Sequence, residues 1–154
     1  MKAKRILFPT DLSALADAAL RYATSLARDS GATLLIVHVE TPPVIYGGDE
    51  MYSGVYQADV GEISEMLEKV VPHDPAVKCE HQLLQGDAAT EIVRVAEEEK
   101  ADMIVMATHG RTGLGRILMG SVAEAVVRKA PCPVFTLRHP ERLNEAEEKD
   151  GAEE

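Results

Sequence analysis

The run TLLIVHV, from Thr33 to Val39, constrains the fold more than any other segment of this 154-residue chain. It is an almost unbroken series of apolar and β-branched residues, as in a strand that is buried on both faces of a sheet. Strands covered on both faces occur in parallel sheets whose connections are helices. The run therefore indicates an α/β protein.

Strand-like and helix-like segments alternate along the chain. We expect strands in five short apolar or β-branched runs, at residues 5–8, 33–39, 77–84, 103–107 and 134–137. Apolar residues recur at helical spacing between these runs, and the helix ends are marked by Ser13, Gly31, Pro72, Asp87, the capping-box pair Ser121 and Glu124, and Pro131. The alternation predicts an open parallel sheet with helices on both faces.

The composition indicates one globular domain followed by an acidic tail. With 154 residues, of which 45% are hydrophobic, the chain is long enough for a single core. Residues 139–154 carry seven acidic and two basic residues and no apolar periodicity, so we expect a folded domain over 1–138 and a disordered tail over 139–154. The net charge of −10 argues against a nucleic-acid groove, which needs a basic face.

The hydropathy and the cysteines predict where the protein resides. No stretch is long and apolar enough to span a membrane, and the N-terminal sequence lacks the apolar region of a signal peptide. Cys79 and Cys132 have neither CxxC nor metal-site spacing, and we expect both to be small buried residues in a reducing compartment. These features predict a cytoplasmic protein without membrane contact.

The segment ATHGRTGLGRILMGSVAE, from Ala107 to Glu124, points to ligand chemistry. It follows the fourth expected strand, contains four glycines and two arginines, and ends at an expected helix start. Glycine lets the backbone approach an anion, and the N–H groups at a helix start face it from the positive end of the dipole. The segment therefore predicts phosphate binding, with Arg111 and Arg116 as further donors. Capping alone would equally explain Ser121, and solvation would explain the arginines.

A second polar segment follows the first expected strand, at Pro9, Thr10 and Asp11. In open parallel sheets, ligands bind beyond the carboxyl ends of the strands, where the strand order reverses. If the first and fourth strands are neighbours at this point, both segments line one crevice. Asp11 has two interpretations: it accepts hydrogen bonds within its own turn, or it accepts one from a base or ribose of the ligand.

Two histidines and one long loop need interpretation as well. His109, in the glycine-rich segment, is more typical of a packed or solvated loop residue than of a catalyst. His38 lies inside an apolar strand and is expected to be a core residue whose hydrogen bonds are satisfied. Residues 41–57 contain three of the four tyrosines, and a loop of this length is typical of a lid or a binding loop.

Together these residues resemble the universal stress protein family over nearly all of residues 1–138. The resemblance rests on ILFPTDLS, LLIVHV and the long block ATHGRTGLGRILMGSVAEAVVRKAPCPVFTL. It implies a Rossmann-like fold, similar to adenine nucleotide alpha hydrolases, with five parallel strands in the order 3-2-1-4-5 and a homodimer formed through the last strand. One branch of the family binds ATP with the pattern G-x2-G-x9-G-[ST], which Gly110, Gly120 and Ser121 match here, whereas Ala107 replaces the first glycine.

The resemblance implies a role for each matching residue. Adenine would lie among the strand ends, and the phosphates would lie at the start of the last helix. Mg²⁺ or Mn²⁺ would be bound through the phosphates. The nucleotide-binding residues implied in this way are Pro9, Thr10, Asp11, Val39, Met106, Ala107, Gly110, Arg111, Gly120, Ser121 and Val122. The alanine at position 107 is a small change if the backbone there has φ < 0. It is a serious one if φ > 0 or if the methyl group lies against the ligand.

The implied function is regulatory ATP binding in a stress response, together with an unidentified protein partner. One alternative is a protein-interaction module of the same fold whose nucleotide site is lost at Ala107. Another is a slow ATPase. The chain has no GxxxxGK[ST] loop and no evident base to orient a water, so we expect at most weak hydrolysis.

Overall fold

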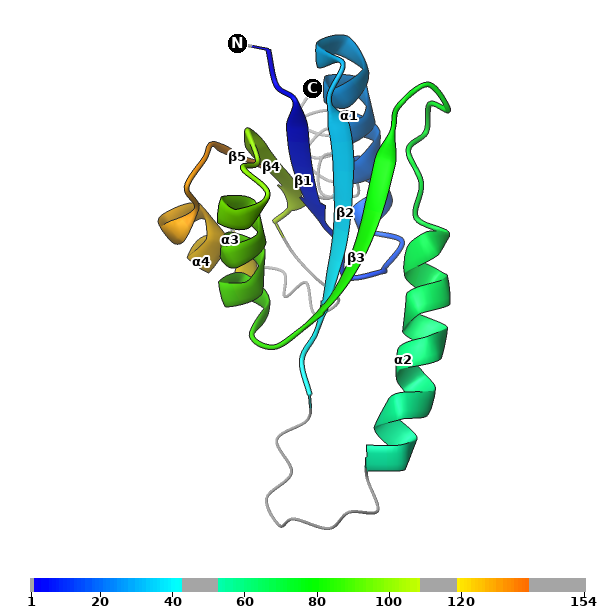
Figure 1. Cartoon of the computed structure of the whole chain (residues 1–154). Coiled ribbons are helices and arrows are strands. Elements are labelled where there is room, and N and C mark those ends of the chain that lie inside the picture. The colour runs from blue at the N-terminus through cyan, green and yellow to red at the C-terminus, as the bar shows by residue number, and fades with distance from the viewer. Residues whose placement is uncertain (1, 43–52, 109–118, 139–154) are drawn as a thin grey trace, which may run out of the picture.

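Five parallel strands form the sheet of the computed structural model, which describes residues 2–42, 53–108 and 119–138. The elements in chain order are β1 (Arg5–Pro9), α1 (Ala16–Ser30), β2 (Thr33–Glu40), α2 (Ser53–Glu68), β3 (Cys79–Gln85), α3 (Ala88–Glu98), β4 (Met103–Ala107), α4 (Ser121–Lys129) and β5 (Val134–Leu137) (Figure 1). The strand order is β3-β2-β1-β4-β5 and every pair is parallel, which confirms the predicted fold class and order.

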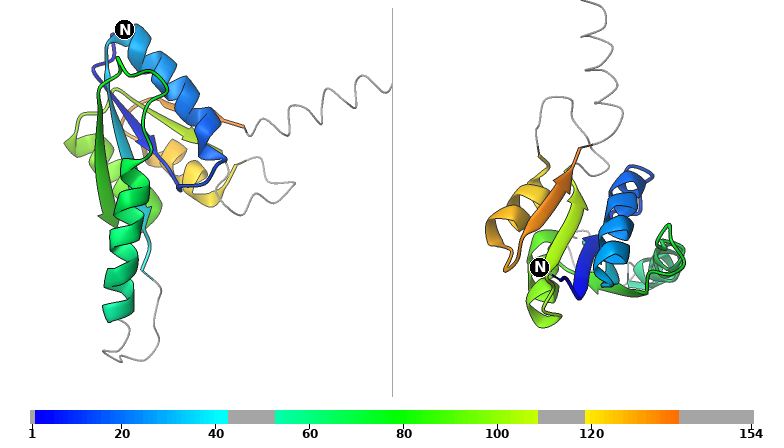
Figure 2. Two further views of the ribbon diagram at one scale, coloured as in Figure 1. Left: turned by 90° about the vertical axis from the view of Figure 1, so that its right-hand side faces the viewer. Right: turned by 90° about the horizontal axis from the view of Figure 1, so that it is seen from above.

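Helices cover both faces of the sheet, with α1 and α2 on one side and α3 and α4 on the other (Figures 1 and 2). Successive residues of β1 show why this arrangement is stable. Phe8 packs in the cluster that includes α1, whereas Leu7 packs in the cluster that includes α3 and α4, and both are fully buried. In β2, Ile36 and Val37 divide between the two clusters in the same way. Each such side chain stabilises the fold by about 1.5–3 kcal/mol on leaving water.

The strand order reverses between β1 and β4, which are hydrogen-bonded neighbours at the centre of the sheet. From β1 the chain continues through α1 to β2 on one side of this point, and from β4 it continues through α4 to β5 on the other. The prediction that the first and fourth strands are neighbours is therefore confirmed. The loops that follow them leave the same edge of the sheet.

Two helix ends agree with the prediction. Gly31 ends α1 in the left-handed conformation, with φ of 72°, which glycine adopts without steric cost. Asp87 caps α3, because its carboxylate accepts hydrogen bonds from the N–H of Thr90 at 3.1 Å and from the Thr90 hydroxyl at 2.6 Å. These bonds hold the pKa of the Asp87 carboxyl below its usual range.

Two predicted helix starts are wrong. Ser13 does not cap α1, which begins at Ala16 with no side-chain cap; the Ser13 hydroxyl instead donates to Asp11 at 2.5 Å. Ser121 is the first residue of α4 rather than its cap, and no side chain caps this helix at Gly120. The predicted capping box therefore does not form, and capping does not explain Ser121.

Other expectations need smaller corrections. α2 begins at Ser53, inside the loop expected at 41–57, and ends at Glu68, short of the predicted end before Pro72. Cys79 and Cys132 are half-buried rather than buried, and their partial burial raises the pKa of both thiols. In the described part of the chain, no helix has the length and apolar character needed to cross a membrane. The expected tail at 139–154 lies outside the described residues.

Candidate functional site

A pocket of about 240 Å³ lies at the carboxyl ends of β1, β2 and β4, beside the starts of α1, α3 and α4. This volume is just below the range of about 300–1,000 Å³ that is typical of small-molecule sites. The pocket is lined by Pro9, Thr10, Asp11, Ala16, Val37, His38, Val39, Ala88, Ile92, Met106, Ala107, Thr108, Gly120, Ser121, Val122 and Ala123. Nine of the eleven predicted site residues are among them, while Gly110 and Arg111 lie outside the described residues. Both predicted segments thus meet in one pocket.

The turn after β1 is held by its own side chains. Asp11 accepts hydrogen bonds from the N–H and the hydroxyl of Ser13, at 3.0 and 2.5 Å. The Thr10 hydroxyl accepts one from the N–H of Leu12 at 3.1 Å, and Leu12 has a φ of 64°, which is uncommon for a residue other than glycine. The interpretation of Asp11 as a turn acceptor is confirmed. Its contact with a ligand stays a prediction.

The edge of β2 that faces β1 is open at the pocket. The Val37 carbonyl accepts from the Thr10 N–H at 2.8 Å, and main-chain groups along a strand alternate between its two neighbours, so Val39 also faces β1. Pairing between β1 and β2 ends at Pro9, but β2 continues to Glu40 (Figure 1). Val39 is still paired with Leu84 of β3, but its N–H and C=O groups lie beyond the part of β2 that is paired with β1.

His38 is buried beside this edge, with both ring nitrogens engaged. Its Nδ1 lies 2.7 Å from the main-chain oxygen of Thr10, and its Nε2 lies 3.0 Å from Oε2 of Glu40. The prediction of a satisfied core histidine is confirmed. The structure adds that His38 lines the pocket.

The end of β4 does not require glycine at position 107. Ala107 is extended within β4 and pairs with Leu137 of β5. Among the described residues other than glycine, only Leu12 and Lys100 have positive φ. A methyl group at position 107 is therefore compatible with the backbone, although Ala107 does line the pocket.

The start of α4 supplies hydrogen-bond donors to the pocket. Gly120 has extended backbone angles and donates its N–H to the Thr108 carbonyl at 2.6 Å. The next N–H groups, of Ser121 and Val122, belong to the first helical turn, where the helix itself offers no acceptor. Gly120 has no side chain with which to cap the helix, and no side chain of the described residues is recorded as its cap, so among these residues the groups and the positive end of the dipole are available to an anion.

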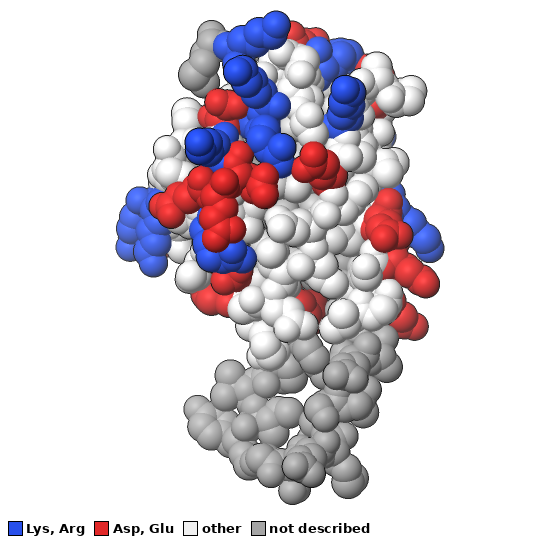
Figure 3. All heavy atoms as spheres, in the orientation of Figure 1, with Lys and Arg blue, Asp and Glu red and all other residues white. Residues whose placement is uncertain are grey.

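Charge is sparse around the pocket. Asp11 and His38 are the ionisable residues among the described lining residues. In the view of Figure 3, Lys and Arg side chains lie mainly over the upper and left parts of the molecule, whereas Asp and Glu side chains continue down both of its sides. Arg5, for example, contacts Glu80 and Glu99 at 2.9 and 2.7 Å near the start of β1. An anion in the pocket would thus meet main-chain donors rather than a cationic side chain of the described residues.

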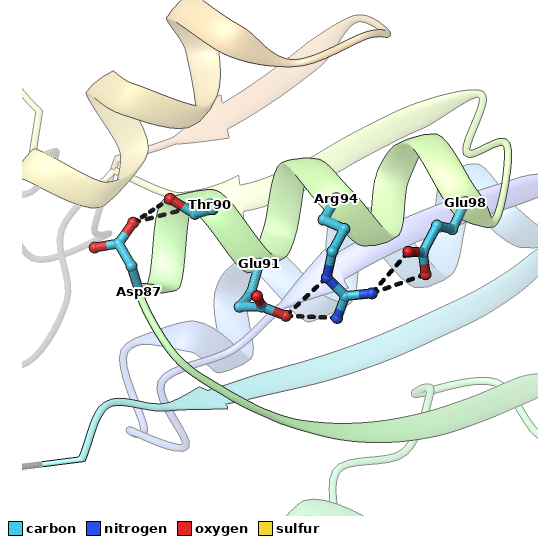
Figure 4. A network of polar contacts seen from close by, with 5 residues as sticks. All are labelled: Asp87, Thr90, Glu91, Arg94 and Glu98. Carbon is cyan, nitrogen blue, oxygen red and sulfur yellow. Dashed lines mark hydrogen bonds and ion pairs between the residues drawn. The ribbon is translucent and has the colours of Figure 1, made fainter.

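The outer face of α3 is occupied by an ion-pair network (Figure 4). Arg94 contacts Glu91 at 2.5 Å and Glu98 at 2.8 Å, and these hydrogen bonds raise the pKa of its guanidinium. Asp87 is bound to Thr90 at the start of the same helix. The network orders the exposed face of α3, while Ala88 and Ile92 of this helix line the pocket.

Seven lining residues were missed by sequence reasoning as site residues: Ala16, Val37, His38, Ala88, Ile92, Thr108 and Ala123. Most are apolar positions at the starts of helices, which a core pattern does not distinguish from a pocket wall. For Ala88 the predicted cap at Asp87 was a usable signal, because it places that helix start at the same edge of the sheet. His38 and Thr108 gave no signal, since their contacts depend on distant segments.

Comparisons with known proteins agree with this geometry. The model of the universal stress protein family matches residues 2–138. Universal stress protein MJ0531 of Methanocaldococcus jannaschii is 36% identical over 144 residues, which cover 90% of this chain and 84% of that protein. The solved universal stress protein of Archaeoglobus fulgidus in complex with dAMP is 26% identical with a TM-score of 0.54, covering 88% of this chain and 98% of that one.

A further solved structure, a universal stress protein in complex with cAMP, is 22% identical and has a TM-score of 0.61, covering 90% of this chain and 99% of that one. At this identity the likeness shows the fold alone. The family match nevertheless spans every strand of the sheet and the described part of the pocket. The chain belongs to the universal stress protein family.

Proposed function

We propose that this chain is a cytoplasmic regulator of a stress response that binds an adenine nucleotide, ATP above all, in the pocket. One observation carries the proposal: a mainly apolar pocket ends on an uncapped helix N-terminus where the strand order reverses. The relative solved with dAMP supports the nucleotide class. ATP is favoured because Gly110, Gly120 and Ser121 match the motif of the ATP-binding branch.

The start of α4 is proposed to hold the phosphates. The Gly120 N–H is engaged with Thr108, so the donors are the N–H groups of Ser121 and Val122 and the Ser121 hydroxyl. A negative charge at a helix start is stabilised by about 0.3–1 kcal/mol when exposed, and by up to about 2 kcal/mol when partly buried. Arg111 lies outside the described residues and keeps its predicted role as a further phosphate donor.

The opposite end of the pocket is proposed to hold the adenine. Val37, Met106 and Ile92 offer an apolar surface for the flat base. The open edge of β2 presents the N–H and C=O of Val39, a donor and an acceptor on one residue. The Watson–Crick edge of adenine carries the complementary acceptor and donor. This pairing favours adenine over a base with the opposite pattern.

A divalent cation is proposed to bind with the nucleotide rather than before it. Across residues 2–42, 53–108 and 119–138, no group of three or more His, Cys, Asp or Glu side chains is placed to hold a metal. Mg²⁺ keeps several waters and binds well to phosphate oxygens. We therefore expect Mg²⁺ or Mn²⁺ to change the affinity for ATP and to show no binding alone.

Binding rather than turnover is the proposed activity. Asp11 is bound to Ser13, and His38 is bound to Thr10 and Glu40, so the two ionisable residues of the described pocket lining already have structural roles. A slow ATPase is the alternative, and a turnover assay with purified protein separates it from simple binding. Loss of inorganic phosphate release in a pocket variant would assign any turnover to this site.

The last strand is proposed to form a homodimer. β5 is an edge strand, so one row of its main-chain groups has no neighbouring strand within the described sheet. Phe135 of β5 is 44% exposed, and Val127 of the preceding helix, α4, is 46% exposed. Exposed apolar residues next to an open edge favour association with a second copy or with a protein partner. This surface is also where an interaction module without nucleotide would act.

Calorimetric titration of nucleotide-free protein with ATP, with and without Mg²⁺, tests the proposal. Gly120→Val should abolish binding, because the angles at Gly120 (φ −66°, ψ 161°) accept valine and Gly120 lines the pocket, where added volume would compete with the ligand. Gly61→Val is the matched control, since a Cβ atom added at Gly61 of α2 meets nothing within 4 Å beyond its chain neighbours and its own helix backbone. If the wild type gives neither heat nor thermal stabilisation with ATP or AMP, the nucleotide proposal fails and the interaction module is favoured.

A further inference from the structure

We propose that His38 is a positioning residue of the nucleotide site, which keeps the edge of β2 open by holding the Thr10 carbonyl away from it. This inference rests on the proposed function for its ligand, but its structural part stands on contacts within the chain. His38 is 8% exposed, and its ring lies between the turn after β1 and the end of β2.

The first step concerns the proton on the ring. The Thr10 main-chain oxygen, 2.7 Å from Nδ1, can only accept a hydrogen bond, so Nδ1 must carry a proton. Nε2 lies 3.0 Å from Oε2 of Glu40, and a hydrogen bond between these two atoms needs one further proton. Either the ring nitrogen or the carboxyl group carries it. In either arrangement the pair is neutral overall, and His38 donates from Nδ1 to Thr10. Glu40 thereby fixes the orientation of the ring.

The second step concerns the sheet. In a parallel ladder that continued past the Thr10 N–H bond to Val37, the next bond would join the Val39 N–H to the Thr10 carbonyl. That carbonyl is the atom that His38 holds. In the described part of the chain, the Val39 N–H accordingly has no hydrogen-bond acceptor. The histidine thus takes the acceptor that would otherwise close the edge.

The third step concerns the place at which the ladder stops. The opening occurs at the switch point, where Pro9, Thr10 and Val39 all line the pocket. Glu40 is also tied to the following loop, because its carbonyl accepts from the Gly86 N–H at 3.0 Å. Both sides of the open edge are therefore held, and the edge is preformed for a flat ligand with a donor and an acceptor.

Amide hydrogen exchange tests the structural part without any ligand. In the wild type, the Val39 amide should exchange at least about tenfold faster than the paired Val37 amide, as expected for an N–H outside the ladder. In His38→Leu, the released Thr10 carbonyl should accept from Val39, and exchange there should slow by about tenfold. His38→Asn should keep fast exchange, because the asparagine amide can donate from a position close to Nδ1.

Titration with ATP and with tripolyphosphate tests the ligand part. His38→Leu should lower the affinity for ATP by about tenfold, which corresponds to the loss of one hydrogen bond to the base. The affinity for tripolyphosphate should stay within about twofold of the wild-type value. His38→Asn should restore ATP binding to within about threefold of the wild type. His81→Leu is the matched control, because His81 is another strand histidine that contacts a main-chain carbonyl, that of Val70 at 2.6 Å, and does not line the pocket.

Several outcomes would overturn the inference. One is slow exchange of the Val39 amide in the wild type, and another is an unchanged ATP affinity in His38→Leu. A third is an equal loss of affinity for ATP and for tripolyphosphate in this variant, which indicates a general structural defect. A wild type that binds no ATP overturns the proposed function instead. In that case the exchange experiment alone decides whether His38 keeps the edge open.

Discussion

The carbonyl oxygen of Thr108 accepts a hydrogen bond from the N–H of Gly120 at 2.6 Å. Thr108 also bonds to β5, through its N–H and its hydroxyl, which lie 2.8 and 3.1 Å from the Leu137 carbonyl. The start of α4 is thus fixed against the ends of β4 and β5. This contact occupies the Gly120 donor and leaves the anion-binding role to the residues that follow it.

Ser121→Ala should separate ligand binding from stability. The Ser121 hydroxyl does not cap α4, so its loss should change the free energy of unfolding by no more than about 0.5 kcal/mol. ATP affinity should fall about tenfold or more, because a hydrogen bond to a charged group contributes about 1.5–3 kcal/mol. Calorimetry and thermal unfolding on the same sample measure both effects. Unchanged ATP affinity would show that the Ser121 hydroxyl is not a phosphate donor.

Ala107→Gly should not improve binding. The backbone at Ala107 is extended and paired with Leu137, so this position needs no conformation that alanine cannot adopt. We expect ATP affinity within about threefold of the wild type, and a loss of stability of about 0.5–1 kcal/mol from the added backbone freedom. A large gain in ATP affinity would show that the methyl group obstructs the ligand.

Asp102 should make folding stability depend on acid pH. Its carboxylate accepts from the N–H groups of Arg5 at 3.0 Å and Lys4 at 2.7 Å, which lowers its pKa. A lowered folded-state pKa contributes stability above the unfolded-state value of about 3.9, and this contribution is lost as the pH falls through the folded-state pKa. Asp102→Asn should therefore unfold at a lower temperature than the wild type at pH 7. The difference should shrink below about pH 4.

The control for this pH series is Asp29→Asn, a change at an exposed aspartate of α1. Its unfolding midpoint should follow that of the wild type across the whole pH range. If the wild type and Asp102→Asn stay equally far apart down to about pH 2, titration of Asp102 is not the cause of the difference.

Phe135→Asp should give a monomer if the last strand forms the dimer. A charge at this position meets its own copy across a two-fold interface, where like charges are unfavourable. Sedimentation velocity should show one species at the dimer mass for the wild type and one at the monomer mass for the variant. Tyr22→Asp is a suitable control, because Tyr22 is 57% exposed on α1, and α1 covers the opposite face of the sheet from α4. A monomeric wild type would refute the dimer.

The sequence predicted those features that depend on local pattern. The β4 and β5 boundaries agree with the expected strands at 103–107 and 134–137, because these runs are short, apolar and bounded by helix signals. The helix starts at Ser13 and Ser121 were wrong because the turn at Asp11 and the contact between Thr108 and Gly120 set them. The place of His38 was equally inaccessible, since its acceptor is 28 residues away in sequence.

Amide NMR titration with ATP, compared with tripolyphosphate, tests the central claim most directly. The pocket account predicts that ATP shifts the amides of Thr10 and Val39 at one end and those of Ser121 and Val122 at the other, whereas tripolyphosphate shifts only the second pair. Saturable shifts confined to another surface, or no shift with millimolar ATP, would contradict the account.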